Sequence, residues 1–149
     1  STQAGVAGGV TPNPTNDEVH TGCTNHAEVC RVVFYPDRIC FDTLLKIFFE
    51  THDPTAVNRQ GPDDIGTEYR SAVYCTSDKQ LRAAESAKVR AASLLRANGL
   101  RDGEVVTEIA PLREFYRAEV EHQQHDWRPG VRAGGGLGPT GLKMGALGS

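Results

Sequence analysis

Apolar residues recur at helical spacing in two stretches of the chain. In the first, residues 41–53, they lie three and four positions apart on one helical face, as Phe41, Leu44, Leu45 and Phe48. Asp42 stands in the first turn, where a negative charge complements the positive end of the helix dipole. We expect this helix to stop at Asp53, because Pro54 pushes the residue before it out of the α region.

The second stretch predicts a longer and better-defined helix. The sequence "SDKQ" at 77–80 matches a capping box, in which the first and fourth side chains satisfy free backbone donors. A stripe follows at helical spacing, formed by Leu81, Ala84, Ala87, Ala91, Leu94 and Leu95. Asn98 and Gly99 then supply a typical C-terminal stop.

Three segments carry the composition of β-strands. Residues 27–35, "AEVCRVVFY", are rich in valine and aromatic residues and are bounded by Pro36. The apolar second half of this segment predicts a strand that is buried on both faces. Shorter strands are predicted at about 70–75 and 105–110, where "EVVTEIA" alternates apolar and polar positions.

The ends of the chain follow other patterns. Closely spaced glycines and prolines in residues 1–25 predict extended backbone and turns rather than helix, in a segment that wraps around the core without packing into it. Residues 115–124 are compatible with a short helix. Residues 128–149 are rich in glycine and poor in large apolar side chains, so we expect an irregular coil that buries little surface.

Strands and helices that alternate on this scale predict a sheet with helices packed on it, a layered α/β or α+β domain. At 149 residues the chain suits one domain. We place it at 1–127, followed by the coil at 128–149.

Charge and composition narrow the function classes. The 16 basic and 19 acidic residues are interspersed and sum to −3, so the sequence offers no basic stripe for nucleic acid. No apolar run approaches the ~18 residues of a membrane helix, and the first residues lack the features of a signal peptide. We expect a protein that binds neither nucleic acid nor membrane, and a monomer located in the cytoplasm.

The cysteines and histidines give weak signals. Cys23, Cys30, Cys40 and Cys75 are irregularly spaced, without a CxxC pair, which favours buried or incidental thiols over a disulfide framework. His122 and His125 lie three residues apart and could bind a metal with His26 or a cysteine. Metal binding is a minor alternative, and we predict neither a metal site nor a cofactor.

Two polar segments are candidates for chemistry. Glu28 stands at the head of a predicted strand, in "HAE", and Tyr69 stands before another, in the polar segment "DDIGTEYR". These side chains could meet at one sheet edge, although each also suits an ordinary turn. An enclosed carboxyl group holds its proton to higher pH and can then donate a hydrogen bond to an oxygen atom.

Several motifs occur in an order that is typical of a known protein family. The chain resembles peptide-methionine (S)-S-oxide reductase, the A-type methionine sulfoxide reductase, through "GCTNHAEV", "HDPT", "NRQG", "GTEYRSA" and "HQQ". The resemblance covers essentially the whole chain. It implies an α+β fold of the ferredoxin-like type, a two-layer α/β sandwich with a mixed sheet.

The resemblance also implies a reaction. A thiolate attacks the sulfur of methionine S-sulfoxide while an acid donates a proton to the oxygen, and the cysteine becomes a sulfenic acid. A second thiol captures it as a disulfide, which thioredoxin or another dithiol reduces. The implied catalytic residues are Glu28 as proton donor, Asp64 and Tyr69, with substrate contacts from His26, Asp63 and Gly66. Asp63 and Asp64 are equal candidates for the pocket acid.

The resemblance also implies a role for the polar segment 51–74. Pro54 and Pro62 restrict the backbone, whereas Gly61 and Gly66 permit tight turns. We expect this loop to form a wall of the sulfoxide pocket.

Several positions depart from the family pattern. The family's nucleophile lies in a "GCFW" motif on a first strand and helix, and these residues do not contain it. None of the four cysteines occupies that position, so we expect the thiol to lie in a preceding segment. Asn16 and His125 stand where the family has tyrosines. An alternative therefore remains, a catalytically inactive relative that binds methionine sulfoxide or a protein partner.

Overall fold

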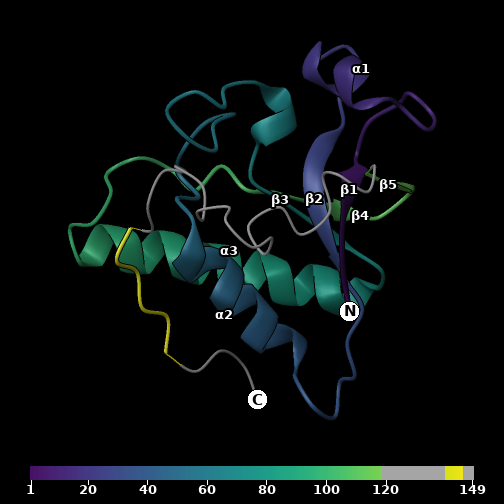
Figure 1. Cartoon of the computed structure of the whole chain (residues 1–149). Helices are drawn as coiled ribbons and strands as arrows, with labels where there is room; N and C mark the ends of the chain where they lie inside the picture. Colours follow the sequence, from purple (N-terminus) through teal and green to yellow (C-terminus); the bar gives the residue numbers. More distant parts are fainter. Residues whose placement is uncertain (119–139, 146–149) are drawn as a thin grey trace, which may run out of the picture.

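The computed structural model describes residues 1–118 and 140–145 (Figure 1). Two small sheets lie beside two crossing helices, α2 and α3. The elements, in chain order, are β1 Thr2–Ala7, α1 Asn16–His20, β2 Ala27–Val32, α2 Phe41–Thr51, the 3₁₀ turn η1 Thr67–Tyr69, β3 Ala72–Cys75, α3 Asp78–Ala97, β4 Glu108–Pro111 and β5 Phe115–Arg117.

The first sheet is antiparallel, with β1 between β2 and β5. Val6 of β1 lies opposite Glu28 of β2 and Tyr116 of β5, which fixes the register of all three strands. Gly5 permits the close approach of β5, because a Cβ there would lie 2.4 Å from the Phe115 ring. The segment that was expected only to wrap around the core is therefore the central strand of this sheet.

The second sheet pairs β3 and β4 in parallel, with Ala72 opposite Glu108. Parallel and antiparallel pairs together with the packed helices confirm the α+β class. Within the described residues, β2 pairs with β1 and β3 pairs with β4, and no backbone pairing joins β2 to β3. The strands of these residues therefore form two sheets.

The core lies mainly between α2 and α3. Leu45 and Phe49 of α2 are buried against a row of small residues on α3, which allows the two helices to approach closely; the row comprises Ala84, Ala87 and Ala91, followed by Leu95. Both helices match the sequence prediction. Helix α2 ends three residues before Pro54, and Ser77 caps α3 by accepting the Gln80 N–H at 3.2 Å.

The C-terminal coil contributes to this core, contrary to expectation. Residues 140–145 form no helix or strand, but the side chains of Leu142 and Met144 are 1% exposed and belong to the core cluster. Arg90 donates a hydrogen bond to the Met144 carbonyl at 3.0 Å, and the Met144 N–H donates to Glu50 Oε2 at 3.0 Å. The backbone of this segment is thereby tied to both helices.

The N-terminal prediction missed a short helix. Helix α1 begins after Thr15, whose hydroxyl accepts the Glu18 N–H, while the Glu18 carboxylate accepts the Thr15 N–H. This reciprocal pair is a capping box. The surrounding glycines and prolines obscured the signal "TNDE".

Two strands also differ from their predicted forms. Strand β2 ends at Val32, and Val33 and Tyr35 beyond it are exposed, so the segment is not buried on both faces. Residues 115–117 form strand β5 rather than the start of a helix, because they pair with the open edge of β1. Residues 119–124 of that predicted helix lie outside the described part of the chain.

No helix in residues 1–118 or 140–145 has the length and apolar character needed to cross a membrane.

Candidate functional site

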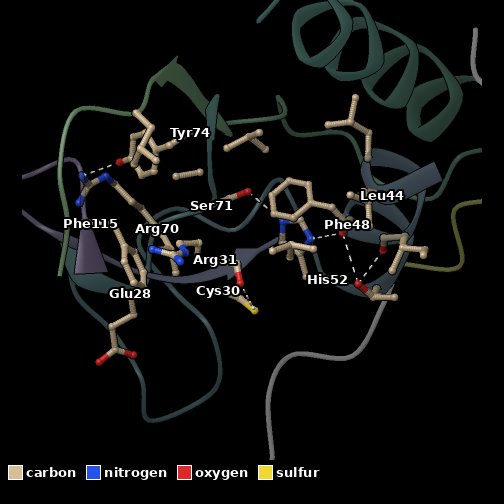
Figure 2. Close-up of a pocket in the computed structure, with 18 of the residues that line it drawn as sticks. Glu28, Cys30, Arg31, Leu44, Phe48, His52, Arg70, Ser71, Tyr74 and Phe115 are labelled. Carbon is tan, nitrogen blue, oxygen red and sulfur yellow. Dashed lines mark hydrogen bonds between the residues drawn. The ribbon is translucent and has the colours of Figure 1, made fainter. Parts of the chain in front are cut away.

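A cavity of about 850 Å³ lies among β2, α2 and β3 (Figure 2). Its apolar wall comes from these three elements and from β5, with Phe41, Leu44, Phe48, Val73 and Phe115 among the lining residues. Glu28 and Tyr69 both border it, as do Arg59 and Gln60 of the polar loop. Part of the polar loop therefore forms part of the wall of this cavity.

Glu28 and Tyr69 approach each other through a third residue, His20 at the end of α1. The Tyr69 hydroxyl lies 3.2 Å from Nδ1 of His20, and Glu28 Oε1 lies 4.0 Å from its Nε2. The histidine and tyrosine rings are tilted, with centroids 6.0 Å apart. Strand β2, turn η1 and helix α1 thus bring three polar side chains together.

The Tyr69 hydroxyl keeps its proton at neutral pH. Burial is the main cause that raises the pKa of Tyr69 to about 12, and the negative charges of Glu28, Asp64 and Glu68 add to it. A protonated phenol can donate a hydrogen bond to an oxygen atom. The site therefore contains a neutral donor beside a carboxyl group.

The same electrostatics distinguish the two aspartates. The charge of Asp64 acts on Tyr69, and its side chain is half-buried, whereas Asp63 is exposed. Of the two aspartates, Asp64 is therefore the one whose charge acts on the Tyr69 hydroxyl.

Glu28 lies at the rim of the cavity. Its side chain is 33% exposed, and its carboxyl group points away from Phe48 and His52 (Figure 2). The described residues therefore enclose the Glu28 carboxyl group less than we expected from the sequence.

The turn that carries Tyr69 is fixed by Gly66. The Gly66 N–H donates to the Asn58 carbonyl at 2.9 Å, and the Gly66 carbonyl accepts the Tyr69 N–H at 3.0 Å. Its φ of 153° lies in a region that is costly for residues with a side chain, and a Cβ there would lie 2.2 Å from Glu68 Oε1. The position therefore requires glycine.

Substituting Gly66→Ala should lower the free energy of unfolding by about 1–3 kcal/mol, because alanine must adopt this strained backbone. Urea unfolding measures the change. Gly103→Ala is the matched control, since within the described part of the chain a Cβ at 103 meets only Thr55 Cβ, at 3.7 Å. Equal stabilities of the two variants would show that Gly66 does not hold the turn.

Arg70 connects the segments that carry the site. Its guanidinium donates to Thr67 O at 2.9 Å and to Asn25 O at 3.0 Å, close to Tyr69 and Glu28 in the chain. It also forms an ion pair with Glu108 of β4 at 2.8 Å and donates to the Tyr74 hydroxyl at 3.1 Å. These bonds fix η1 against the start of β2 and against the second sheet.

His26, like Asp63, Asp64 and Gly66, is not among the residues that line the cavity, whereas Glu28 and Tyr69 are. His26 is buried, and both ring nitrogens bind the backbone of residues 9–11. Nδ1 accepts the Gly9 N–H at 3.0 Å, so Nε2 carries the ring proton and donates to the Thr11 carbonyl at 2.7 Å.

His52 belongs to a partly buried hydrogen-bond chain beside the cavity. Its Nδ1–H donates to the Phe48 carbonyl, and its Nε2 accepts the Ser71 hydroxyl at 2.8 Å. The Ser71 oxygen in turn lies 2.8 Å from Thr107 Oγ1. Burial lowers the pKa of His52 below its usual value, so the neutral ring is favoured.

This shift predicts a pH dependence of stability. The folded protein binds fewer protons at His52 than the unfolded chain does. The contribution of His52 to the free energy of unfolding is therefore complete above the unfolded pKa of ~6.5 and declines as pH falls below it. Urea unfolding at pH 8.0 and 5.5 should show the loss in the wild type and a smaller loss in His52→Gln. An identical loss in the two proteins would exclude His52 as its source.

Two functional candidates were missed by sequence reasoning. His20 lies 49 residues from Tyr69 in the sequence, and no local pattern connects them. Arg70 appeared only as part of "GTEYRSA", without a role. All four cysteines are free; Cys75 is buried, and exposed Cys30 borders the cavity.

Metal binding receives no support from the described part of the chain. Residues 1–118 and 140–145 contain no group of three or more histidine, cysteine, aspartate or glutamate side chains that could hold a metal ion. His122 and His125 lie outside these residues.

Comparison with known proteins gives a consistent result. A family profile described as peptide methionine sulfoxide reductase matches residues 1–129. The MsrA of Rhodospirillum centenum is 54% identical over 125 residues, which cover 84% of this chain and 56% of the relative. The MsrA of Salinispora tropica is 47% identical over 144 residues, covering 95% of this chain and 64% of the relative.

Solved structures agree with these relatives. Methionine sulfoxide reductase A of Corynebacterium diphtheriae is 42% identical with a TM-score of 0.77, and the match covers 90% of this chain and 70% of that one. Reduced Mxr1 from Saccharomyces cerevisiae is 34% identical with a TM-score of 0.75, covering 89% and 73%. The chain spans 56% to 64% of the length of the two curated relatives named above. From its sequence and its fold, this chain belongs to the MsrA family of peptide methionine sulfoxide reductases.

Proposed function

We propose that this chain supplies the oxygen-binding half of a peptide-methionine (S)-S-oxide reductase site. The observation that carries the proposal is that Glu28 and Tyr69 border one largely apolar cavity and approach opposite ring nitrogens of His20. A sulfoxide has a polar oxygen and apolar carbon substituents. A protonated donor at the rim and aromatic side chains in the wall match these two features.

In this proposal Glu28 is the acid. A thiolate attacks the sulfoxide sulfur while Glu28 donates its proton to the oxygen and Tyr69 donates a hydrogen bond to it. The oxygen passes to the thiol, so that sulfoxide and thiol give methionine and a sulfenic acid. A second thiol then forms a disulfide and releases water, and a dithiol such as thioredoxin restores the thiol.

Other predicted residues receive supporting roles. Asp64 is our choice for the pocket acid because its charge acts on Tyr69, whereas exposed Asp63 contributes a peripheral contact. Gly66 sets the turn, and His26 serves the site by fixing residues 9–11.

We further propose that the nucleophilic thiol comes from a segment outside these 149 residues. The sequence lacks "GCFW", and the relatives named above are longer than this chain. Among the described residues, one edge of β2 and one edge of β3 have no strand partner, and both strands border the cavity. An extended segment placed between them would join the two sheets and close the cavity over Glu28.

We propose a cytoplasmic monomer that acts on methionine S-sulfoxide in proteins or as the free amino acid. We also propose that the reductase domain spans 1–127 and is followed by the coil at 128–149; of the latter, residues 140–145 pack against the core.

The direct test is reduction of methionine sulfoxide with dithiothreitol or thioredoxin. The polypeptide encoded by the complete reading frame should reduce the S epimer and leave the R epimer unchanged. The 149-residue chain alone should reduce neither. If the complete polypeptide leaves the S epimer unreduced but binds it in calorimetry, the protein is an inactive relative. If the chain alone is active, the thiol lies within it, and Cys30 is the first candidate.

A further inference from the structure

His20 is a polar residue of the site to which neither the family motifs nor the reaction above gives a task. It is the last residue of α1, and its side chain is 39% exposed. Its two ring nitrogens face different partners, Tyr69 of η1 through Nδ1 and Glu28 of β2 through Nε2. A residue in this place can affect both groups that are proposed to act on the ligand oxygen.

The contact between Nδ1 and the Tyr69 hydroxyl, at 3.2 Å, has two possible directions. When Nδ1 carries no proton it can only accept, so the phenol donates its single proton to His20. When Nδ1 carries a proton, the ring donates to the phenol oxygen instead. The phenol proton is then free to point toward a ligand in the cavity. The direction of one hydrogen bond therefore decides whether Tyr69 can donate to a sulfoxide oxygen.

We propose that His20 is a positioning residue that controls the Tyr69 hydroxyl, withholding its proton from a bound sulfoxide when Nδ1 is unprotonated and releasing it when the ring carries both protons. The inference rests on the proposed function, because the ligand oxygen it invokes is that of the sulfoxide.

Carboxyl groups flank the contact between His20 and Tyr69. Glu28 Oε1 lies 4.0 Å from Nε2 and is the described carboxylate that pairs with His20. On the tyrosine side, the charges of Asp64 and Glu68 act on Tyr69 in addition to that of Glu28. A histidine side chain changes its charge between about pH 5 and 8. Sulfoxide binding should consequently be tighter at the acidic end of this range.

The first test needs no ligand. In the 149-residue chain labelled with ¹³Cζ-tyrosine, the Tyr69 signal should shift with the pH titration of His20, followed in parallel by ¹⁵N-histidine signals. In His20→Phe this component of the Tyr69 shift should disappear. His20→Gln is the second variant, because its amide can still contact the hydroxyl but does not titrate. A Tyr69 shift that is the same in wild type and both variants overturns the inference.

The second test measures binding of N-acetylmethionine S-sulfoxide methylamide by calorimetry or NMR at pH 5.5 and 8.0. The wild type should bind about three- to tenfold more tightly at pH 5.5, the effect of roughly one hydrogen bond. The ratio should fall below the wild-type value in His20→Phe and His20→Gln, which keep any contribution of the Glu28 carboxyl group, and also in Tyr69→Phe. Circular dichroism confirms that each variant is folded.

The outcomes separate the two proposals. If Tyr69→Phe weakens binding but the wild type shows equal affinity at both pH values, the proposed function stands and the role of His20 is wrong. The role is also wrong if His20→Phe and His20→Gln keep the wild-type ratio. If no protein binds the sulfoxide at either pH, both the proposed function and the inference built on it fail.

Discussion

Replacing Glu28 with glutamine is expected to slow reduction of methionine S-sulfoxide by about 100-fold or more in the complete polypeptide, since positioned general acids contribute roughly 10²–10⁴-fold. Glutamine preserves the shape of the side chain at the cavity rim but cannot deliver a proton. Single-turnover reduction of a dabsyl-labelled substrate measures this step separately from recycling of the thiol.

The matched control is Glu104→Gln, because Glu104 is exposed and does not border the cavity. It should leave the rate unchanged. If Glu28→Gln retains a rate within threefold of the wild type while remaining folded, Glu28 is not the proton donor.

Phe49→Ala is expected to produce the largest loss of stability, about 3–5 kcal/mol in the free energy of unfolding. Phe49 is fully buried between α2 and α3, and its ring lies edge-on to Phe48 with centroids 5.0 Å apart. The loss combines the removed apolar surface with the cavity that remains. Because folded domains have only ~5–15 kcal/mol of stability, the variant should be close to unfolding.

Urea unfolding compares this variant with Val89→Ala, which changes a 69% exposed residue of α3 and should alter stability by about 0.5 kcal/mol or less. If Phe49→Ala costs no more than the control, the two helices do not pack as described.

The two main helices could be predicted because local information defines them. The apolar stripe of α3 lies between a capping residue, Ser77, and a stop at Asn98 and Gly99, and each signal is legible within the segment itself. The end of α2 follows similarly from Pro54. The tail had a weaker signal, in which buried Leu142 and Met144 alternate with exposed Gly141, Lys143 and Gly145. High glycine content concealed this two-residue period, and the core that receives the tail is built by α2 and α3.

The site could be predicted only as a set of residue types. Sequence motifs identified Glu28 and Tyr69 as candidates. How close these two side chains lie depends on how Arg70 holds β2 and η1, and the hydrogen-bond partners of Arg70 come from four separate segments. The contact between His20 and Tyr69 is equally non-local. The position of Glu28 at the rim also depends on packing around β2, which the sequence of one strand does not specify.

The central claim is that the Glu28 carboxyl and the Tyr69 hydroxyl bind one sulfoxide oxygen. A crystal structure of the chain with N-acetylmethionine S-sulfoxide methylamide tests this most directly. The account predicts the ligand oxygen within about 2.6–3.2 Å of both groups, with the methyl group against the aromatic wall of the cavity. A ligand whose oxygen contacts neither residue would contradict it.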